Sequence, residues 1–425
     1  MQAKKCSVGL TVAILTVTLL AGARAVAQEQ VLYDFNLNKS GATPYSALIT
    51  DGAGNLYGTA SEGGPSNHTG TVFESSPGTD GNWNYTVLHS FSDANSVKDG
   101  AEPYSSLISD ASGNLYGTTH IGGKYNYGTV FELVKPTKKA TWTWELLHSF
   151  NANGTDGFEP AYASLVLDAG GNLYGTTYYG GAYNAGAVFE LVKPTKGKAW
   201  VENILHSFKG NPTDGANPSA GLTFDGNGNL YGTTTYGDTT GLYNAGTVFE
   251  LSRNGSGVWN YVGVLHNFSN DGVDGSEPGN GSLVFDSSSG GLYGTTVVGG
   301  ANQLGTVFEL APNDSGGWTE AVLYDFGSYS TDGVFPYSGL TFDASGNLYG
   351  TTTQGGSAAY GTVFELSQNG SGLWTETLLH SFNNNGTDGL LPDAGVVLDS
   401  VTGNLYGTTP GGGAYTYGTV YEVTP

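Results

Sequence analysis

Short runs of apolar residues alternate with polar residues along most of the chain, and Gly, Asn, Asp or Pro bounds each run. One stretch shows the whole pattern: "PYSSLISDASGNLYGTTHIGGKYNYGTVFELVKPTKKATWTWELLHSF". Its apolar positions follow the two-residue period of a β-strand, and no helical period intervenes. The pattern predicts four strands in this stretch: "YSSLISD", "NLYGTT", "GTVFEL" and residues 142–150.

The same unit returns seven times. The tyrosines of the "GNLYGTT" motif and its two close variants lie 56 to 62 residues apart, at Tyr57, Tyr116, Tyr174, Tyr231, Tyr293, Tyr349 and Tyr406. A period held from end to end indicates one repeat architecture, and not several independent domains. The Asp and Gly before each tyrosine, with Asn in six of the seven copies, are typical of a tight turn between the first and second strands.

Seven units of four antiparallel strands predict an all-β fold, a seven-bladed β-propeller. The fourth strands are out of phase with the others, because one copy, "LYDF" at residues 32–35, precedes the first unit and the last unit ends after its third strand. We therefore expect the N-terminal strand to complete blade seven and close the ring, which leaves no long exposed edge. The expected blades cover residues 43–91, 103–150, 160–208, 218–268, 278–326, 336–382, and 392–423 plus 31–35.

The fourth strand carries Trp, then His or Tyr six residues later, then Phe. Even spacing places these aromatic residues on one face, where they can fill the wedge between neighbouring blades. Blade four breaks the spacing, because His266 follows Trp259 by seven residues, and this predicts an extra β-bulge.

The "GNLYGTT…GG…GTVFEL" unit resembles the tandem repeat of the choice-of-anchor GloVer-type bacterial proteins, named for Gloeobacter and Verrucomicrobia. The resemblance covers nearly all of the chain after residue 27. It implies export, usually with a C-terminal anchor, and it implies no catalytic residues. Because this sequence ends with its last repeat, we do not expect such an anchor here.

The first residues predict export as well. Lys4 and Lys5 precede an apolar run at residues 8–20, and "AVA" at residues 25–27 offers a cleavage site, so we interpret residues 1–27 as a signal peptide and residues 28–425 as a single propeller. The expected location is periplasmic, cell-surface or secreted. Cys6 is the only cysteine, so the exported chain carries no disulfide.

The charge narrows the range of partners. The formal net charge is −23, and removal of the signal peptide makes it more negative. An acidic protein of this kind does not offer the basic surface that nucleic acid requires. We expect no nucleic-acid partner, no transmembrane segment, and a monomer.

Groups present in every blade are interpreted as scaffold. A Glu follows the third-strand aromatic residue in all seven units, and five of the seven histidines occupy one fourth-strand position. A metal or general-base role is conceivable for them, but we expect each to bond within its own blade. No nucleophile or metalloprotease motif occurs, so we expect no catalytic residues, no metal and no cofactor. "NGTDG" and "NDGVDG" weakly suggest Ca²⁺, although Asx-turns explain them better.

Residues that differ between blades are the candidates for binding. The loops from strand four to one and from strand two to three emerge on the same face, and we call this the loop-rich face. Tyrosine rings beside Asn and Asp suit a carbohydrate ligand. The predicted ligand-binding tyrosines are Tyr125, Tyr127, Tyr178, Tyr179, Tyr183, Tyr236, Tyr243, Tyr360, Tyr415 and Tyr417.

The opposite face carries a basic spot with two interpretations. It is either a site for an anionic partner or a pair of solvated turns. It comprises Lys135, Lys138, Lys139, Lys193, Lys196 and Lys198.

Three hypotheses for function remain open. The first is a non-catalytic, exported binding module for a glycan or an exported or cell-surface protein on the loop-rich face. The second is a secreted enzyme, a lyase or hydrolase acting on polysaccharide, with carboxylates at the mouth of the central channel. The third is a structural or adhesive module at the cell surface. The even repeats favour the first, because an enzyme needs an asymmetric cluster of acidic or basic groups.

Overall fold

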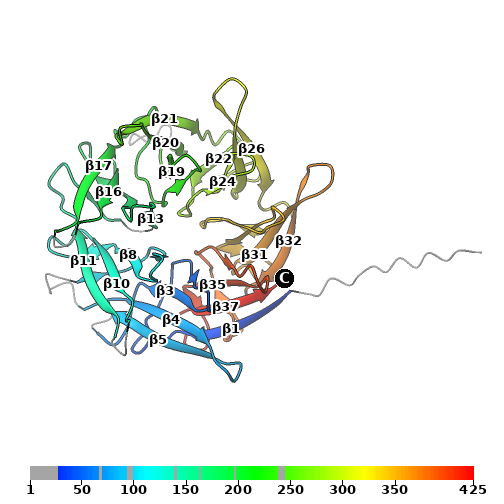
Figure 1. The fold of residues 1–425 in the computed structure, drawn as a ribbon. Helices are drawn as coiled ribbons and strands as arrows, with labels where there is room; N and C mark the ends of the chain where they lie inside the picture. Colours follow the sequence, from blue (N-terminus) through cyan, green and yellow to red (C-terminus); the bar gives the residue numbers. More distant parts are fainter. Residues whose placement is uncertain are drawn as a thin grey trace, which may run out of the picture.

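The computed structural model describes residues 27–425, except 67–68, 93–98, 138–140, 161, 163, 196–197 and 238–244. The described chain forms a ring of small antiparallel sheets around a central opening, and none of its elements is a helix (Figure 1). The chain runs once round the ring, so that the last blade lies beside the first (Figure 1). The predicted seven-bladed β-propeller is confirmed.

Each blade has four strands, numbered here from the axis outwards. The first strands are β2 Ile49–Thr50, β7 Ile108–Ser109, β13 Val166–Leu167, β18 Thr223–Phe224, β23 Val284–Phe285, β28 Thr341–Phe342 and β34 Val397–Leu398. The second strands are β3 Leu56–Ala60, β8 Leu115–Thr119, β14 Leu173–Thr177, β19 Leu230–Thr234, β24 Leu292–Gly299, β29 Leu348–Thr352 and β35 Leu405–Thr409. The first strands are shorter than the sequence pattern predicted, because the residues before them lie in the connection from the previous blade.

The outer strands are longer. The third strands are β4 Thr71–Pro77, β10 Thr129–Val134, β16 Ala187–Val192, β20 Thr247–Arg253, β25 Thr306–Pro312, β31 Thr362–Gln368 and β37 Thr419–Thr424. The fourth strands are β5 Trp83–Ser90, β11 Thr143–Ser149, β17 Val201–Ser207, β21 Trp259–Asn267, β26 Trp318–Asp325, β32 Trp374–Ser381 and β1 Gln28–Asp34.

Short extra pairings tie the loop-rich face together. They join the connection before the first strand to the end of the second strand of the same blade: β6 Gly100–Ala101 with β9 Ile121–Gly122, β12 Gly157–Phe158 with β15 Tyr179–Gly180, β22 Gly275–Pro278 with β24, β27 Gly333–Val334 with β30 Gln354–Gly355, and β33 Gly389–Leu390 with β36 Gly411–Gly412.

The N-terminal strand closes the ring, as predicted. β1 is the outer strand of blade seven and pairs antiparallel with β37, from Gln28 opposite Thr424 to Asp34 opposite Thr419. Asp34 also accepts a hydrogen bond of 2.7 Å from the Ala414 amide. The two ends of the described chain are therefore held in one sheet.

The fourth strands carry a β-bulge against the third strand in every blade. Blade four has a second bulge, between Glu250 and Leu251, where Val262 is the extra residue of β21. This confirms the bulge predicted from the spacing of Trp259 and His266.

Aromatic pairs fill the boundaries between blades. The Phe that follows each fourth strand is buried and meets a third-strand ring of the next blade edge-on, as Phe91 meets Phe131 at 5.4 Å and Phe35 meets Phe73 at 5.3 Å. The buried residues form seven clusters, and each draws its members from two adjacent blades. Packing between blades, and not within one, therefore builds the core.

The "LYGTT" motif is explained by its contacts in blade two. A Cβ on Gly117 would lie 2.7 Å from the ring of Phe131, so that only glycine lets this ring pack. The Tyr116 hydroxyl lies 3.2 Å from Asp110 Oδ2 and 2.9 Å from Glu132 Oε1. Thr118 donates to a carbonyl of the next blade, and the hydroxyl of Thr119 bonds to that of Thr129. The repeated motif is therefore scaffold chemistry, as the sequence indicated.

Small residues allow the first strands to crowd together near the axis. A Cβ on Gly281 would lie 1.6 Å from the backbone nitrogen of Gly339 in the next blade. No side chain fits between these two backbones, so the glycines set how closely blades five and six approach.

Candidate functional site

A cavity of about 700 Å³ lies at the axis of the ring, and residues of six blades line it. Its defining side chains come from the connections that enter the first strands, which places it on the loop-rich face. We call this cavity the channel mouth and define it by Tyr45, Tyr104, Tyr162, Asn280, Tyr337 and Asp393.

Three tyrosines from consecutive blades form a row of rings. The ring centres of Tyr45 and Tyr104 are 5.6 Å apart, and those of Tyr104 and Tyr162 are 5.3 Å apart. His120 packs edge-on against Tyr104 at 5.7 Å. Burial is the main cause that raises the pKa of all three phenols, which therefore stay protonated and able to donate hydrogen bonds at neutral pH.

Asp393 is the acidic group of the channel mouth. Thr353 donates a hydrogen bond of 3.2 Å to its carboxylate. Burial nevertheless raises the pKa of Asp393 to about 6. The charge of Asp393 raises the pKa values of Tyr45, Tyr162 and Tyr337 in turn, which shows that the carboxylate lies within electrostatic reach of three blades.

The channel mouth is acidic. Glu62 lines it beside Asp393, and the described lining residues include neither Lys nor Arg. The mouth therefore suits a neutral or positively charged ligand better than an anionic one.

One repeated backbone feature aims these side chains at the axis. The connection that enters the first strand of each blade contains a proline. In all seven blades the residue before this proline has a left-handed conformation, for example Glu102 with φ of 56° and Leu391 with φ of 57°. This conformation is unfavourable for residues other than glycine and is also disfavoured before proline. Its repetition shows that the ring holds the connection firmly in this shape.

The sequence-based hypothesis of carboxylates at the mouth of the central channel named none of the residues that line it. After the proline, the blades carry Tyr45, Tyr104, Tyr162, Ser219, Asn280, Tyr337 and Asp393, with one extra residue before Tyr162 and Asn280. A comparison of the seven units at this position would have revealed the variation.

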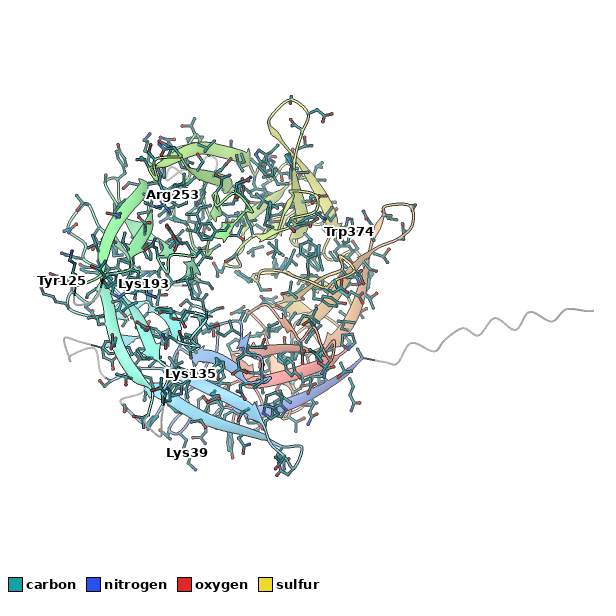
Figure 2. All side chains as sticks on the ribbon, in the orientation of Figure 1. Lys39, Tyr125, Lys135, Lys193, Arg253 and Trp374 are labelled. Atoms are coloured by element: carbon teal, nitrogen blue, oxygen red, sulfur yellow. The ribbon has the colours of Figure 1, made fainter. Side chains whose placement is uncertain are left out.

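The predicted loop tyrosines do not gather into one site. Tyr125 lies at the outer edge of the ring in Figure 2, far from the central opening. Tyr183 and Tyr415 are more than half exposed. Tyr178 meets two other members of the predicted set: its ring centre is 4.8 Å from that of Tyr179, and its side chain is hydrogen-bonded to that of Tyr236.

Others of this set take part in the scaffold. Phe158 packs between Tyr127 and Tyr179 at 5.1 and 5.7 Å. The carbonyl groups of Tyr360 and Tyr417 accept amide hydrogen bonds from the next blade. Tyr236 is half-buried, and Tyr243 lies outside the described residues.

The predicted basic spot is only partly described, because Lys138, Lys139 and Lys196 lie outside the described residues. Lys135 Nζ lies 4.0 Å from Asp51 Oδ2 of the preceding blade. Burial raises the pKa of Glu132, and the charge of Lys193 offsets a part of this rise. Lys198 lies in the turn that follows Lys193. Lys135 and Lys193 therefore lie near carboxylates of the protein itself, and an anionic partner stays a prediction.

The loops that suggested Ca²⁺ use their oxygens internally. Asn153 Oδ1 accepts hydrogen bonds from the amides of Thr155 and Asp156, and Asp271 Oδ1 accepts from those of Val273 and Asp274. These are the contacts of Asx-turns.

The fourth-strand histidines lie at the boundaries between blades, and not inside one blade as expected. Each is within 3.5 Å of an Asp in the connection that follows, as His206 Nε2 is 2.7 Å from Asp214 Oδ1. The middle of the next blade's fourth strand supplies a third group. This position of the fourth strand holds an aromatic residue in three blades and a glutamate in the other four: Tyr85, Trp144 and Tyr261, and Glu29, Glu202, Glu320 and Glu376.

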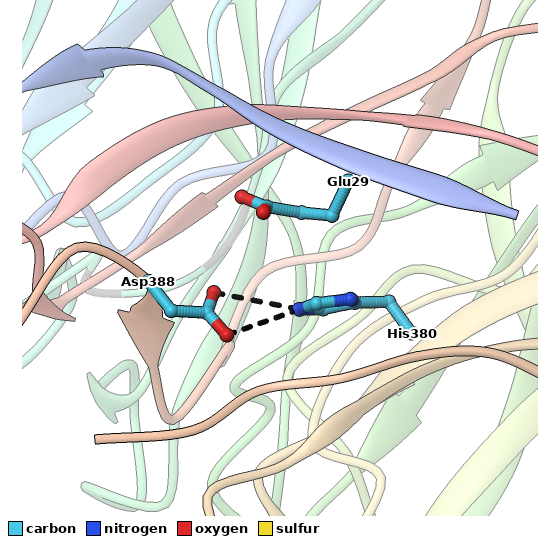
Figure 3. A group of neighbouring side chains, drawn as sticks. All are labelled: Glu29, His380 and Asp388. Atoms are coloured by element: carbon cyan, nitrogen blue, oxygen red, sulfur yellow. Dashed lines mark hydrogen bonds and ion pairs between the residues drawn. The ribbon is translucent and has the colours of Figure 1, made fainter. Parts of the chain in front are cut away.

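In two of these boundary groups, one His, one Asp and one Glu offer ligand atoms that all lie within 4.8 Å of one another. They are His148 with Asp156 and Glu202, and His380 with Asp388 and Glu29 (Figure 3). Both groups have the chemistry to hold a metal ion.

Comparison with solved structures shows the propeller fold. A polysaccharide lyase of family PL25, an ulvan lyase, is 10% identical with a TM-score of 0.51, over 93% of this chain and 95% of that one. PorZ, a surface component of the type-IX secretion system of Porphyromonas gingivalis, is 14% identical with a TM-score of 0.50, over 91% of this chain and 46% of that one. At such identities the likeness shows the fold alone.

A putative 6-phosphogluconolactonase from Bacteroides uniformis is also 14% identical, with a TM-score of 0.49, over 79% of this chain and 84% of that one. Among curated proteins, none matches this sequence. No helix in the described part of the chain is long and apolar enough to cross a membrane.

The Gloeobacter/Verrucomicrobia repeat matches the sequence in three overlapping stretches, residues 18–242, 97–281 and 238–425. Together these matches span the whole propeller, and the repeated unit is the one whose contacts hold the blades together. The chain therefore belongs to the Gloeobacter/Verrucomicrobia repeat family.

Proposed function

We propose that this propeller is an exported binding module that holds a neutral carbohydrate chain in the channel mouth. The observation that carries the proposal is the row of rings from Tyr45 through Tyr104 to Tyr162, beside the carboxylate of Asp393. Sugar rings stack on aromatic faces, and carboxylates accept hydrogen bonds from sugar hydroxyls. A cavity of about 700 Å³ has room for a short segment of a glycan.

The charge of the site selects among glycans. Uronic acids and sulfated sugars would bring negative charge next to Glu62 and Asp393, with no cation among the described lining residues to offset it. Neutral sugars meet no such repulsion. The proposal therefore separates this protein from binders of acidic polysaccharides.

Hydrolysis of a polysaccharide is the second candidate function. Asp393 favours it, because a carboxyl group with a pKa of about 6 can give and take a proton near neutral pH. Glu62 would be the second carboxyl group that glycoside hydrolysis requires. Release of new reducing ends from a bound glycan, lost in Asp393→Asn, would establish this activity.

The first experiment is a screen of the purified protein on an array that holds both neutral and acidic glycans. We expect a neutral class to bind. Tyr104→Ala and Tyr337→Ala should each weaken that binding at least about tenfold, because each removes a stacking surface. Tyr125→Ala and Tyr183→Ala are the matched controls on the outer rim and should bind as the unaltered protein does.

Each other result redirects the proposal. Loss of binding in the rim variants but not in the channel variants would move the site to the loop tyrosines. Binding to acidic glycans alone would contradict the charge argument. If no glycan on the array bound, an exported or cell-surface protein would be favoured as the partner instead.

Export is tested separately. N-terminal sequencing of the exported protein tests cleavage after Ala27.

A further inference from the structure

The boundary between blades two and three holds a group that the scaffold does not use fully. His148 and Asp156 belong to β11 and the connection after it, and Glu202 lies on β17 of the next blade. The side chains of His148, Asp156 and Glu202 are 20%, 8% and 15% exposed. Three groups that bind protons or metals therefore converge where little water reaches.

Three polar atoms of this group lack a hydrogen-bond partner, although Asp156 Oδ2 accepts a hydrogen bond of 2.9 Å from the Asn151 amide. His148 Nε2 lies 3.5 Å from Asp156 Oδ2 and 3.6 Å from Glu202 Oε1, which is too far for a good hydrogen bond. His148 Nε2, Asp156 Oδ1 and Glu202 Oε1 are all buried without a partner. Asp156 is more than nine-tenths buried, and leaving its oxygen unpaired costs free energy unless something else binds there.

The neighbouring boundary shows what a self-sufficient arrangement looks like. Between blades three and four, His206 bonds to Asp214 at 2.7 Å, and Tyr261 stacks on the imidazole at 3.8 Å. Tyr261 occupies the position of Glu202, so the same scaffold accepts either residue. Glu202 is therefore not needed to close the boundary.

The spacing of the group fits a metal ion. Ligand atoms about 2.0–2.2 Å from a tetrahedral ion are separated from one another by about 3.3–3.6 Å. The two distances from His148 Nε2 fall in this interval. Two carboxylates balance the charge of a divalent cation, and three protein ligands leave a fourth position for water.

We propose that His148, Asp156 and Glu202 bind a divalent transition-metal ion, with Zn²⁺ as the first candidate. The imidazole nitrogen and the small number of ligands favour Zn²⁺ over Ca²⁺ or Mg²⁺, which take six or more oxygens or keep their water. The ion joins blade two to blade three. This site is separate from the channel mouth and does not depend on the carbohydrate proposal.

The boundary between blades six and seven repeats the ligand set with one difference. In Figure 3, Glu29 on the N-terminal strand points towards Asp388 and His380. Asp388 already contacts His380 Nε2 at 3.3 and 3.4 Å and accepts two hydrogen bonds from Asn383. Only Glu29 Oε1 is without a partner there, so we expect weaker binding at this second group.

The test measures zinc bound per chain by equilibrium dialysis of EDTA-stripped protein at pH 7.5, in a Glu29→Gln background that silences the second group. We expect one ion per chain. Glu202→Tyr should lose this ion and stay folded, because it reproduces the boundary of Tyr261. Zinc should also raise the Tm of the parent protein and not that of Glu202→Tyr.

Two further variants keep the test decisive. Glu320→Tyr makes the same substitution at the boundary of blades four and five, where the described ligand atoms do not converge, and it should keep the ion. Glu202→Gln preserves the shape of the side chain and should weaken zinc binding at least about tenfold. It replaces Glu202→Tyr in the test if that variant fails to fold. The proposal would be overturned if the Glu29→Gln protein bound no zinc. It would also be overturned if that protein and both Glu202 variants bound the same amount of zinc per chain.

Discussion

At the scale of single residues, position in the repeat decides the role of a side chain. Tyr174 lies in the scaffold, and its hydroxyl is 3.0 Å from Asp168 Oδ2 and 2.7 Å from Glu190 Oε1. Tyr162 lies in the channel mouth, where it is exposed and its ring centre is 5.3 Å from that of Tyr104. The same residue type therefore serves packing in one place and is available for binding in the other.

Tyr174→Phe removes the one hydrogen that the two carboxylates share. We expect the free energy of unfolding to fall by roughly 1–3 kcal/mol, because buried acceptors lose their donor. Denaturant titration measures the change. Tyr183→Phe on the outer rim is the control and should stay within about 0.5 kcal/mol of the parent protein; an equal loss in both would show that the hydroxyl contacts of Tyr174 are not stabilising.

Asp393→Asn tests the acidic group of the channel mouth. The pKa of Asp393 is about 6, so its carboxylate takes up a proton and loses acceptor strength as pH falls through that value. We expect glycan affinity to weaken below pH 6 in the parent protein and to be flat between pH 4.5 and 8 in Asp393→Asn. Isothermal titration across this range checks it, and an unchanged pH profile in the variant would exclude Asp393 as the cause.

At the scale of elements, the strand that closes the ring is the one most exposed to perturbation. β1 supplies the outer edge of blade seven. Its residues Leu32 and Tyr33, together with Phe35 directly after it, join the cluster between blades seven and one. Without β1, β37 would present an open edge and this cluster would lose one side.

Deletion of residues 1–36 should therefore abolish a cooperative unfolding transition or cause aggregation, since the loss approaches the whole stability of about 5–15 kcal/mol. Circular dichroism melting and size-exclusion chromatography measure the outcome. The control is a circular permutant that joins residues 28–36 after Pro425 through a short turn, which is feasible because Gln28 lies opposite Thr424. If deletion alone left the melting curve unchanged, β1 would not be what closes the ring.

At the scale of the whole molecule, the ring concentrates protonatable groups at its boundaries. The pKa values of Glu320 and Glu376 are raised from 4.5 to about 7, chiefly by burial, with Asp274 and Asp332 adding to the effect. Two neighbouring groups oppose this rise: His266 lowers the pKa of Glu320, and the hydrogen bond from Tyr329 lowers the pKa of Glu376.

These raised values set the direction of the pH dependence. Each folded glutamate holds its proton up to about pH 7, whereas an unfolded one releases it near 4.5. Their contribution to stability is therefore complete below pH 4.5 and is lost as pH rises to 7. We expect a higher Tm near pH 5 than near pH 8.

Glu320→Gln combined with Glu376→Gln should flatten this slope, because an amide does not titrate. Calorimetry from pH 4.5 to 8.5 measures it, with Asp314→Asn in an exposed turn as the control. A slope that the double variant leaves intact would assign the dependence to other groups.

The sequence alone determined the propeller, the number of blades, the closing strand and the extra bulge of blade four. Each of these follows from local patterns, such as strand periods, turn residues and the phase of the repeat, which chain neighbours encode by themselves. The scaffold role of the repeated Tyr and Glu was foreseen for the same reason, since their partners lie within one unit.

Only the tertiary structure decided where unlike residues meet. The channel mouth combines side chains from six blades, and the group of His148, Asp156 and Glu202 joins two. Their convergence depends on ring closure, on the left-handed residue before each proline, and on which side chain the next blade offers. No local pattern encodes these distances, because closing the ring brings together residues that are about one repeat or more apart in the chain.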